Sequence, residues 1–237
     1  MTHPFFEFFN KNRPYIDPDS SKWPKEWSTV YFKSYPRLPQ IKLPKPKLGN
    51  FSLEKAILNR ESNRNFSGKP IKLEELAALL YYGAGITKGE GDMSRRAHPS
   101  GGARYPLEVY PFVFNIDGLN PGVYHYNVKN HHLELLLADK ENLENSKNAF
   151  YGDFISKSSV IFVITMVPWR SSIKYGNFAL KLGLLEAGHI SQNIYLLTQV
   201  LKLKCCALGG FEEKLIHRLL DIDGITETAF YALAVSG

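Results

Sequence analysis

The stretch from about Gly176 to Leu203 is the longest expected helix, and it limits what this chain can fold into. Its apolar side chains point in every direction around the helix axis: Phe178, Leu180, Leu182, Leu184, Leu185, Ile190, Ile194 and Leu197. A helix that is apolar all round has to be buried on most of its sides. Because a single 237-residue domain can hardly bury it alone, we expect a homodimer with this helix in the interface.

The rest of the chain alternates helical and strand-like segments. Helices are expected over Ser52 to Leu58, over KLEELAALLYYGAG, where Gly83 is a plausible C-terminal stop, and over EEKLIHRLL. The expected strands are LEVYPFVFNI, GVYHYN, HLELLLA, SVIFVITMV, CCALG and TAFYALAVS. SVIFVITMV is apolar throughout, as in a central strand buried on both faces. This order predicts an α+β fold with a mainly antiparallel central sheet flanked by helices.

Residues 1–48 differ in composition from residues 49–237, which we take as the main domain. The first segment holds eight of the fourteen prolines and ten aromatic residues. Proline disfavours regular elements, while aromatic residues disfavour a solvated, disordered tail. We therefore expect an extended arm that lies against the body of the protein or against a partner subunit.

Charge and cysteine content exclude several classes of protein. The formal net charge is +6, without a block of five like charges that would suggest a nucleic-acid-binding arm. Cys205 and Cys206 are adjacent in an apolar run, so they cannot form an ordinary structural disulfide and are expected in a buried strand. With no uninterrupted stretch of 18 apolar residues and no secretory signal, we expect a cytoplasmic protein without a membrane segment.

Two motifs favour binding of a ligand. In PSGG, at residues 99–102, the glycines allow the backbone to approach something closely, although a surface turn is an equal alternative. In NRESNRNF, Arg60, Ser62 and Arg64 alternate, so an extended backbone would place two guanidinium groups and a hydroxyl on one side. That arrangement suits a phosphate, while a solvated charged turn is the alternative.

A polar stripe interrupts the long apolar helix. Glu186, His189 and Asn193 are spaced i, i+3 and i+7, so their side chains share one side and need partners. A di-iron site would require a second Glu-x-x-His pair, which the sequence lacks, so we expect no metal. His189 is expected to be a hydrogen-bonded core residue rather than a catalytic one.

In their order along the chain, R-x-S-x-R-x-F, PSGGARYPLE, KYG, LLEAGHISQN and ALGGF resemble the FMN-dependent nitroreductase family. The resemblance extends from about Trp27 to the C-terminus and is greatest to the SagB-type azoline dehydrogenase branch. It implies oxidation of thiazolines and oxazolines in a ribosomally made peptide to thiazoles and oxazoles. It also implies a nitroreductase-like fold, FMN as cofactor, a peptide substrate and a complex with a cyclodehydratase.

The resemblance also implies the roles of individual residues. Lys174 would be the general base, with Tyr175 as its partner. The FMN contacts would be Arg60, Ser62 and Arg64 at the phosphate and ribityl chain, the backbone of Pro99, Ser100, Gly101 and Gly102 at the ring held by the other subunit, Gly209 and Gly210 at the flavin N5/O4 edge, and Gln192 and Asn193 as supporting polar groups.

The Lys-Tyr pair makes a structural demand. A free lysine, with a pKa of about 10.4, is mostly protonated at neutral pH and needs desolvation to act as a base. Because consecutive helical residues face different ways, Lys174 and Tyr175 should lie at or before the start of the long helix. The alternative is a surface lysine beside an interface aromatic residue.

The chain also departs from the family pattern. NFALKLGLL stands where arginine is common in the family, and we expect the site to lack the basic C-terminal extension of many nitroreductases. Arg95, Arg96 and Arg104 are candidates to compensate, although a solvated loop explains the first two equally well. Two other functions remain open: an NAD(P)H-dependent flavin reductase for nitroaromatics or quinones, and a non-catalytic flavoprotein scaffold of a peptide-modifying complex.

Overall fold

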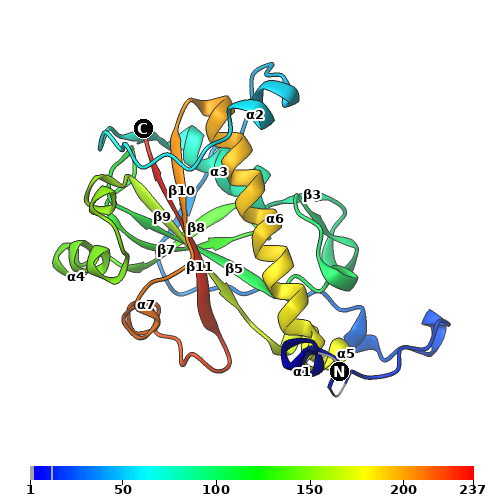
Figure 1. Ribbon diagram of the computed structural model, residues 1–237. Coiled ribbons are helices and arrows are strands. Elements are labelled where there is room, and N and C mark those ends of the chain that lie inside the picture. The colour runs from blue at the N-terminus through cyan, green and yellow to red at the C-terminus, as the bar shows by residue number, and fades with distance from the viewer. Residues whose placement is uncertain (1–2, 12) are drawn as a thin grey trace.

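A seven-stranded antiparallel sheet forms the centre of the computed structural model, which describes residues 3–11 and 13–237 (Figure 1). In spatial order its strands are β1 (Gln40–Lys42), β8 (His132–Leu137), β7 (Gly122–Asn127), β5 (Leu107–Val113), β9 (Val160–Met166), β11 (Thr228–Ser236) and β10 (Lys204–Leu208). All neighbours are antiparallel. Two short ribbons pair β2 (Ile71–Lys72) with β6 (Ile116–Asp117) and β3 (Ile86–Lys88) with β4 (Arg95–Arg96). The predicted α+β fold with an antiparallel sheet is confirmed.

Helices cover both faces of the sheet. They are α1 (Pro4–Asn10), α2 (Leu53–Asn59), α3 (Leu73–Ala84), α4 (Lys140–Ser146), α5 (Trp169–Tyr175), α6 (Phe178–Leu201) and α7 (Glu213–Leu220). Short 3-10 helices lie at Ser20–Lys22, Lys25–Trp27, Gly91–Met93, Gly101–Ala103, Lys147–Ala149 and Asp153–Lys157. The core against α3 and α6 is separate from the core against α4 and α7.

Strand β9 explains why the two cores form. All seven of its residues are buried, as the apolar run SVIFVITMV predicted. Phe162 and Ile164 face α3 and α6, whereas Ile161 and Val163 face the opposite core, because successive side chains in a strand alternate. The sheet is therefore apolar on both faces at its centre.

Helix α6 packs closely on the sheet and on α3 because a glycine removes a side chain at each of the two contacts. A Cβ atom at Gly183 would lie 2.6 Å from the Met166 sulfur of β9. A Cβ atom at Gly83 of α3 would lie 3.2 Å from Ile194 of α6. The expectation that Gly83 ends its helix is wrong: α3 continues to Ala84 and Gly85 is its C-cap, because Gly83 serves helix packing.

The outward side of α6 remains partly apolar. Leu184 and Leu185 are each 53% exposed in the single chain. The inward side packs on the sheet through residues such as Ile190 and Ile194. The long helix is thus half covered by its own chain, and the homodimer stays a prediction.

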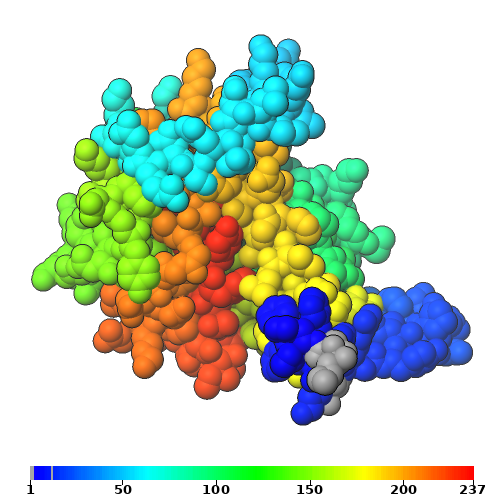
Figure 2. Space-filling view, in the orientation of Figure 1, coloured from blue at the N-terminus to red at the C-terminus, as the bar shows by residue number. Residues whose placement is uncertain are grey.

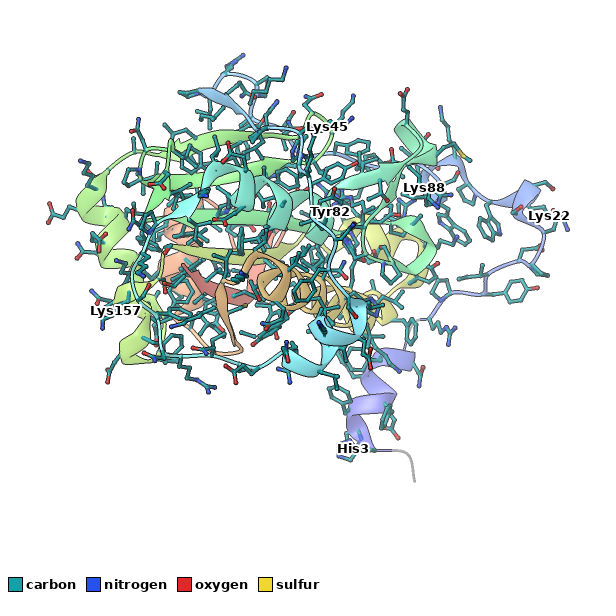
Figure 3. The ribbon with its side chains drawn as sticks, turned by 90° about the horizontal axis from the view of Figure 1, so that it is seen from above. His3, Lys22, Lys45, Tyr82, Lys88 and Lys157 are labelled. Carbon is teal, nitrogen blue, oxygen red and sulfur yellow. The ribbon has the colours of Figure 1, made fainter. Side chains whose placement is uncertain are left out.

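The N-terminal arm contains more regular structure than its prolines suggested. Residues 40–42 form β1, which pairs with β8 at the sheet edge with Gln40 opposite Glu134. Helix α1 begins at Pro4, whose missing N–H costs nothing in a first helical turn. Between them, the arm projects from the body, with Lys22 near its tip (Figure 3). The interpretation as an arm without regular elements was therefore wrong at α1 and β1.

Cys205 and Cys206 lie next to each other on β10, as predicted, and both are free and buried. Cys205 packs into the core of α3 and α6, whereas Cys206 packs into the core of α4 and α7. Burial raises the pKa of both thiols. They therefore behave as small apolar residues in the folded chain.

Candidate functional site

The PSGG loop lies between β4 and β5 and is held against the chain's own helices. A Cβ atom at Gly101 would lie 2.8 Å from Leu182 of α6. Gly102 has a φ of +62°, and a Cβ atom there would collide with the Tyr175 hydroxyl. Contacts inside one subunit thus favour glycine at both positions, most strongly at Gly102, and the loop directly adjoins Tyr175.

Glu186 fixes this loop to α6. Its buried carboxylate accepts a hydrogen bond from the Ser100 hydroxyl and lies 3.1 Å from His98 Nε2. The Tyr105 amide donates to Ser100 Oγ at 2.9 Å. The predicted polar stripe therefore has a partner at Glu186, and the side chain of Ser100 is used for positioning the loop.

The rest of the stripe divides between inside and outside. Asn193 is half-buried, and its side-chain amide donates to the carbonyls of Gly83 and Ala97 at 3.3 and 3.4 Å. His189 is exposed, as is Gln192. The expectation of a hydrogen-bonded core histidine at His189 is wrong, because the stripe follows the border of the buried face of α6.

Lys174 and Tyr175 are the last residues of α5. Gly176, with a φ of +54°, separates them from α6, which begins at Phe178. The pair therefore lies before the long helix, as the chemistry demanded. Only 3% of the Lys174 surface is exposed, so the alternative of a surface lysine is wrong.

Aromatic rings surround the Lys174 amine. Its Nζ lies 3.5 Å from the ring centroid of Trp23 and 5.8 Å from that of Trp27. Burial, followed by the charge of Arg104, holds the pKa of Lys174 below its ordinary value. Burial raises the pKa of Tyr175, against the opposing effect of Arg104. The lysine is thus easier to deprotonate than usual, while the tyrosine stays a hydrogen-bond donor.

The three candidate compensating arginines have different environments. Arg104 is fully buried and donates to the carbonyls of Arg170 and Trp27, both at 2.8 Å. Arg96 is also buried, with its guanidinium 4.8 Å from the Tyr105 ring centroid. The solvated-loop interpretation of Arg96 is therefore wrong, whereas Arg95 is exposed.

The segment with Arg60, Ser62 and Arg64 has no helix or strand and runs beside β10. The Asn63 amide donates to the Cys205 carbonyl at 2.9 Å. The hydroxyls of Ser62 and Tyr195 lie 2.9 Å apart. Ser62 and Arg64 are exposed and Arg60 is half-buried, so two guanidinium groups are available to an anion.

Gly209 and Gly210 directly follow the other end of β10. Both are exposed, and a Cβ atom at Gly209 would meet no atom within 4 Å. One strand therefore connects the proposed phosphate grip to the proposed ring contacts. The donor chemistry of these residues fits a ligand with a phosphate at one end and a hydrogen-bonding ring edge at the other.

The sequence alone did not indicate the residues that contact the Lys-Tyr pair from remote parts of the chain. Trp23 and Trp27 are about 150 residues away along the chain, and no periodicity connects them with Lys174. The only signal is the unusual number of aromatic residues in the arm. His98, the second partner of Glu186, carries no distinguishing spacing either.

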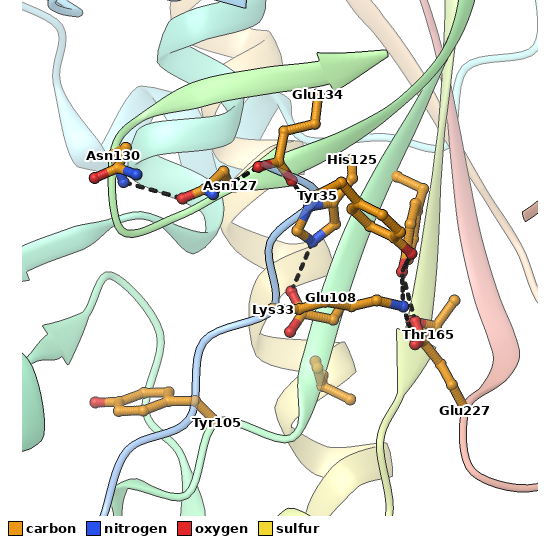
Figure 4. A network of polar contacts seen from close by, with 12 residues as sticks. Lys33, Tyr35, Tyr105, Glu108, His125, Asn127, Asn130, Glu134, Thr165 and Glu227 are labelled. Atoms are coloured by element: carbon orange, nitrogen blue, oxygen red, sulfur yellow. Dashed lines mark hydrogen bonds and ion pairs between the residues drawn. The ribbon is translucent and has the colours of Figure 1, made fainter. Parts of the chain in front are cut away.

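A buried polar cluster lies on the α4/α7 side of the sheet (Figure 4). His125 is held between two carboxylates, with Nδ1 2.7 Å from Glu134 and Nε2 3.1 Å from Glu108. Arg170 donates to the second oxygen of Glu108, and Asn127 donates to Glu134 at 2.9 Å.

These contacts shift the ionisation of the cluster. Burial alone would lower the pKa of His125, but Glu108 and Glu134 outweigh it and raise the pKa. Burial would raise the pKa of Glu134, but His125 and Asn127 lower it to about 2. Burial would also raise the pKa of Glu108, but Arg170, His125 and Arg96 together outweigh it and lower this pKa. The charged forms are therefore all favoured at neutral pH.

Lys33 attaches the arm to the same face through an ion pair with Glu227. Glu227 also accepts hydrogen bonds from Tyr110 and Thr165 at 2.7 and 2.6 Å. Burial would lower the pKa of Lys33, but Glu227 outweighs it and raises the pKa. This pair is well satisfied and suits a structural role.

Residues 3–11 and 13–237 lack two further features. They contain no group of three His, Cys, Asp or Glu side chains that could hold a metal ion. Their helices are too short or too polar to cross a bilayer.

Comparison with known sequences gives a family and several relatives. A model of the nitroreductase family matches residues 57–237. A protein of Methanocaldococcus jannaschii named as a nitroreductase is 30% identical over 177 residues, which cover 75% of this chain and 88% of that protein.

Two other relatives are named for peptide processing. The trifolitoxin-processing protein TfxB of Rhizobium leguminosarum bv. trifolii is 29% identical over 175 residues, covering 70% of this chain and 47% of that protein. The microcin B17-processing protein McbC of Escherichia coli is 26% identical over 134 residues, covering 54% and 49%. The matches thus extend over about half the length of these two proteins.

Solved structures share the fold. A chain of the E. coli microcin synthetase McbBCD complex, with truncated pro-MccB17 bound, has a TM-score of 0.65 at 20% identity, covering 98% of this chain and 86% of that one. A nitroreductase from Desulfovibrio desulfuricans in complex with FMN has a TM-score of 0.53 at 16% identity, covering 79% and 87%.

Proposed function

Since the chain belongs to the nitroreductase family, we propose that it is an FMN-dependent dehydrogenase that oxidises thiazoline or oxazoline rings of a ribosomally made peptide to thiazoles or oxazoles. The observation that carries this proposal is the buried Lys174 amine with Tyr175 as its neighbour, beside the PSGG loop. The two relatives named for peptide processing support a peptide substrate.

The residues along β10 fit FMN. Arg60, Ser62 and Arg64 would hold the phosphate and ribityl chain, and the Gly209 and Gly210 amides would face the flavin N5/O4 edge. The backbone of Pro99, Ser100, Gly101 and Gly102 would approach the ring of the other subunit, while Gln192 and Asn193 would support the site. Bound there, FMN supplies hydride acceptance at N5 and is restored by molecular oxygen.

The chain's own catalytic contribution is proton removal. The azoline loses its Cα proton to Lys174 Nζ and a hydride from the neighbouring ring carbon, and the ring gains a double bond. The lowered pKa of Lys174, due first to burial and then to Arg104, makes the neutral amine available. Tyr175 keeps its proton and can orient the reacting group.

A homodimer would complete the site. Helices α1, α2 and α6 are visible on one face of the molecule in Figure 2, and each carries exposed apolar residues. They include Phe5, Phe6, Phe8, Leu53, Ile57, Leu58, Leu184 and Leu185. A second subunit seated on this face would cover the outward side of α6 and bring its own PSGG loop to the flavin. A cyclodehydratase is the further partner we propose, by analogy with the microcin synthetase complex.

A second candidate function is supported by the M. jannaschii relative, which is matched over 88% of its length. In that case the chain would take a hydride from NADH or NADPH and pass it to nitroaromatics or quinones. Lys174 would then not act as a general base, because hydride transfer to the flavin needs no proton removal from carbon.

The purified protein distinguishes these functions. We expect mass spectrometry of the released cofactor to find FMN, and a heterocyclised azoline peptide to lose two hydrogens per ring in the presence of oxygen. FAD in place of FMN would contradict the proposed phosphate grip. Reduction of nitroaromatics with NADPH and no azoline oxidation would establish the second function, while a chain that retains no flavin would favour a non-catalytic scaffold.

A further inference from the structure

Residues 14–26 form a strap that is attached mainly at its two ends. On one side, Arg13 stacks over the Phe178 ring at 4.6 Å from its centroid. On the other, the Trp27 carbonyl accepts a hydrogen bond from the buried Arg104. Within the described chain, every hydrogen bond and ion pair of residues 14–26 has its partner among residues 17–29. The strap can therefore move without breaking a polar bond to the body.

Trp23 is the point at which this strap touches the proposed base. Its indole N–H donates to the Asp17 carbonyl at 2.7 Å, which turns the ring face toward Lys174. The ring centroid lies 3.5 Å from Lys174 Nζ, close enough for a strong cation–π contact. With Trp27 and Tyr175 nearby, little of the amine is left accessible.

This burial conflicts with the proton transfer assigned to Lys174. A general base has to come within hydrogen-bond reach of the proton that it removes. No substrate atom can approach the Lys174 amine while the Trp23 ring covers it. The covering segment must therefore move before the reaction.

We propose that residues 14–26 are a cap, that Trp23 holds the Lys174 amine in place beneath it, and that a peptide substrate must lift this cap to reach the amine. The proposal rests on the proposed function, since it takes Lys174 as the base. Trp23 is a positioning residue in this arrangement, and the cap determines specificity.

The physical consequence is selection for long substrates. Lifting the cap breaks the cation–π contact and exposes the Trp23 ring, which costs free energy. A peptide can offset that cost with contacts remote from the reacting ring, whereas a small azoline has few contacts to use. The closed cap also keeps the amine from reacting with unrelated molecules.

Lysine acetylation by a limiting dose of acetic anhydride, read by peptide mass spectrometry, tests the cap without any turnover. The exposed Lys88 serves as an internal reference in the same sample. We expect Trp23→Ala to raise the Lys174/Lys88 labelling ratio by about threefold to thirtyfold, the range that corresponds to loss of a cation–π contact. Trp23→Phe, which keeps an aromatic face, should raise it less.

Tyr15→Ala is the matched control, because Tyr15 lies in the same cap and is 80% exposed. It should leave the labelling ratio unchanged. Two results would contradict the proposed cap. One is that Lys174 is acetylated as fast as Lys88 in the protein without substitutions, and the other is that Trp23→Ala leaves the Lys174/Lys88 labelling ratio unchanged.

The specificity part is tested by turnover. The unmodified protein should oxidise an azoline in its full precursor peptide faster than the same ring in a short peptide, and Trp23→Ala should narrow this difference by about threefold or more. An unchanged ratio would overturn it. If Lys174→Met oxidises azolines normally, the proposed function fails, but the labelling result still decides whether the cap exists.

Discussion

Lys33 and Lys174 are both withdrawn from water, but their surroundings are opposite. Lys33 forms an ion pair with Glu227, and its pKa is raised. Lys174 lies against indole rings with Arg104 nearby, and its pKa is lowered. None of the carboxylates in the described chain forms an ion pair with Lys174.

The comparison shows how one residue type serves two purposes. A carboxylate partner keeps an amine charged and makes it part of the fold, as in the cluster of Lys33, Glu227, His125, Glu108 and Glu134. Burial and the like charge of Arg104 lower the pKa of Lys174, so this amine gives up its proton more readily than the amine of Lys33. The environment, and not the residue type, separates the structural lysine from the proposed base.

The largest expected effect is a difference in azoline oxidation between variants of the two lysines. Lys174→Met should lower azoline oxidation on the order of a hundredfold to ten-thousandfold, the usual cost of losing a general base. Lys33→Met should retain most of the turnover per flavin-loaded molecule, assayed well below its unfolding temperature. Tyr175→Phe should lose activity in the same way as Lys174→Met. Each variant should stay yellow, since none of the replaced residues is assigned to the FMN phosphate. Normal azoline oxidation by both Lys174→Met and Tyr175→Phe would refute the assignment of the Lys-Tyr pair.

The pH dependence of turnover sharpens the same contrast. A lysine base works in its neutral form, so the rate should rise about tenfold per pH unit below the pKa of Lys174 and level off above it. Because burial and Arg104 lower this pKa, the plateau should begin below pH 10.5. A rate that keeps rising to the ordinary lysine pKa would show that Lys174 is not shielded during catalysis.

Most strands and helices could be predicted from the sequence, because each carries its own pattern of apolar residues. The apolar run of β9 and the long α6 are examples of strong local signals. Strand β1 was missed because its three residues are ordered by pairing with β8 and carry no pattern of their own. Gly83 was misread because packing against Ile194 determines its place, and packing is not visible in one segment.

The site was legible only in part for the same reason. The Lys-Tyr pair, the PSGG loop and the buried Glu186 each stand in a recognisable motif. The ring of Trp23 on Lys174, and the Arg104 hydrogen bond to Trp27, join segments far apart in the sequence. His189 was misplaced because helical spacing indicates a common side but not where that side meets solvent.

The buried cluster of His125, Glu108 and Glu134 should make the free energy of unfolding depend on pH. The pKa of Glu134 is about 2 in the folded chain, against an ordinary 4.5. Its contribution is therefore present above pH 4.5 and is lost as the pH falls toward 2, on the order of 3 kcal/mol. The raised pKa of His125 works the other way: its contribution is present below pH 6.5 and is lost as the pH rises through the folded pKa.

Urea unfolding at several pH values measures both losses of stability, the one at acid pH and the one at higher pH. Replacing His125 with Gln should reduce the loss on the acid side, because Glu134 then has a pKa closer to normal. A free energy of unfolding that is flat between pH 5 and pH 2 would contradict the ion-paired description of this cluster.

The smallest expected effect is on stability at neutral pH. Lys33→Met leaves Glu227 without its cation and should lower the free energy of unfolding by about 2 kcal/mol, less than for fully buried pairs because the Lys33 side chain is 23% exposed. Lys174→Met leaves no carboxylate unpaired and should change it by less than about 1 kcal/mol. Equal losses in the two variants, measured by thermal or urea unfolding, would remove the distinction between the two lysines.

The adjacent cysteines of β10 allow the two halves of the protein to be watched separately. Cys205 is sealed between the sheet and α6, whereas Cys206 is sealed on the side of α7. A thiol reagent can reach each sulfur only when the layer over it opens. The order in which the two are alkylated during slow unfolding therefore reports which layer detaches first, without any substitution in the sequence.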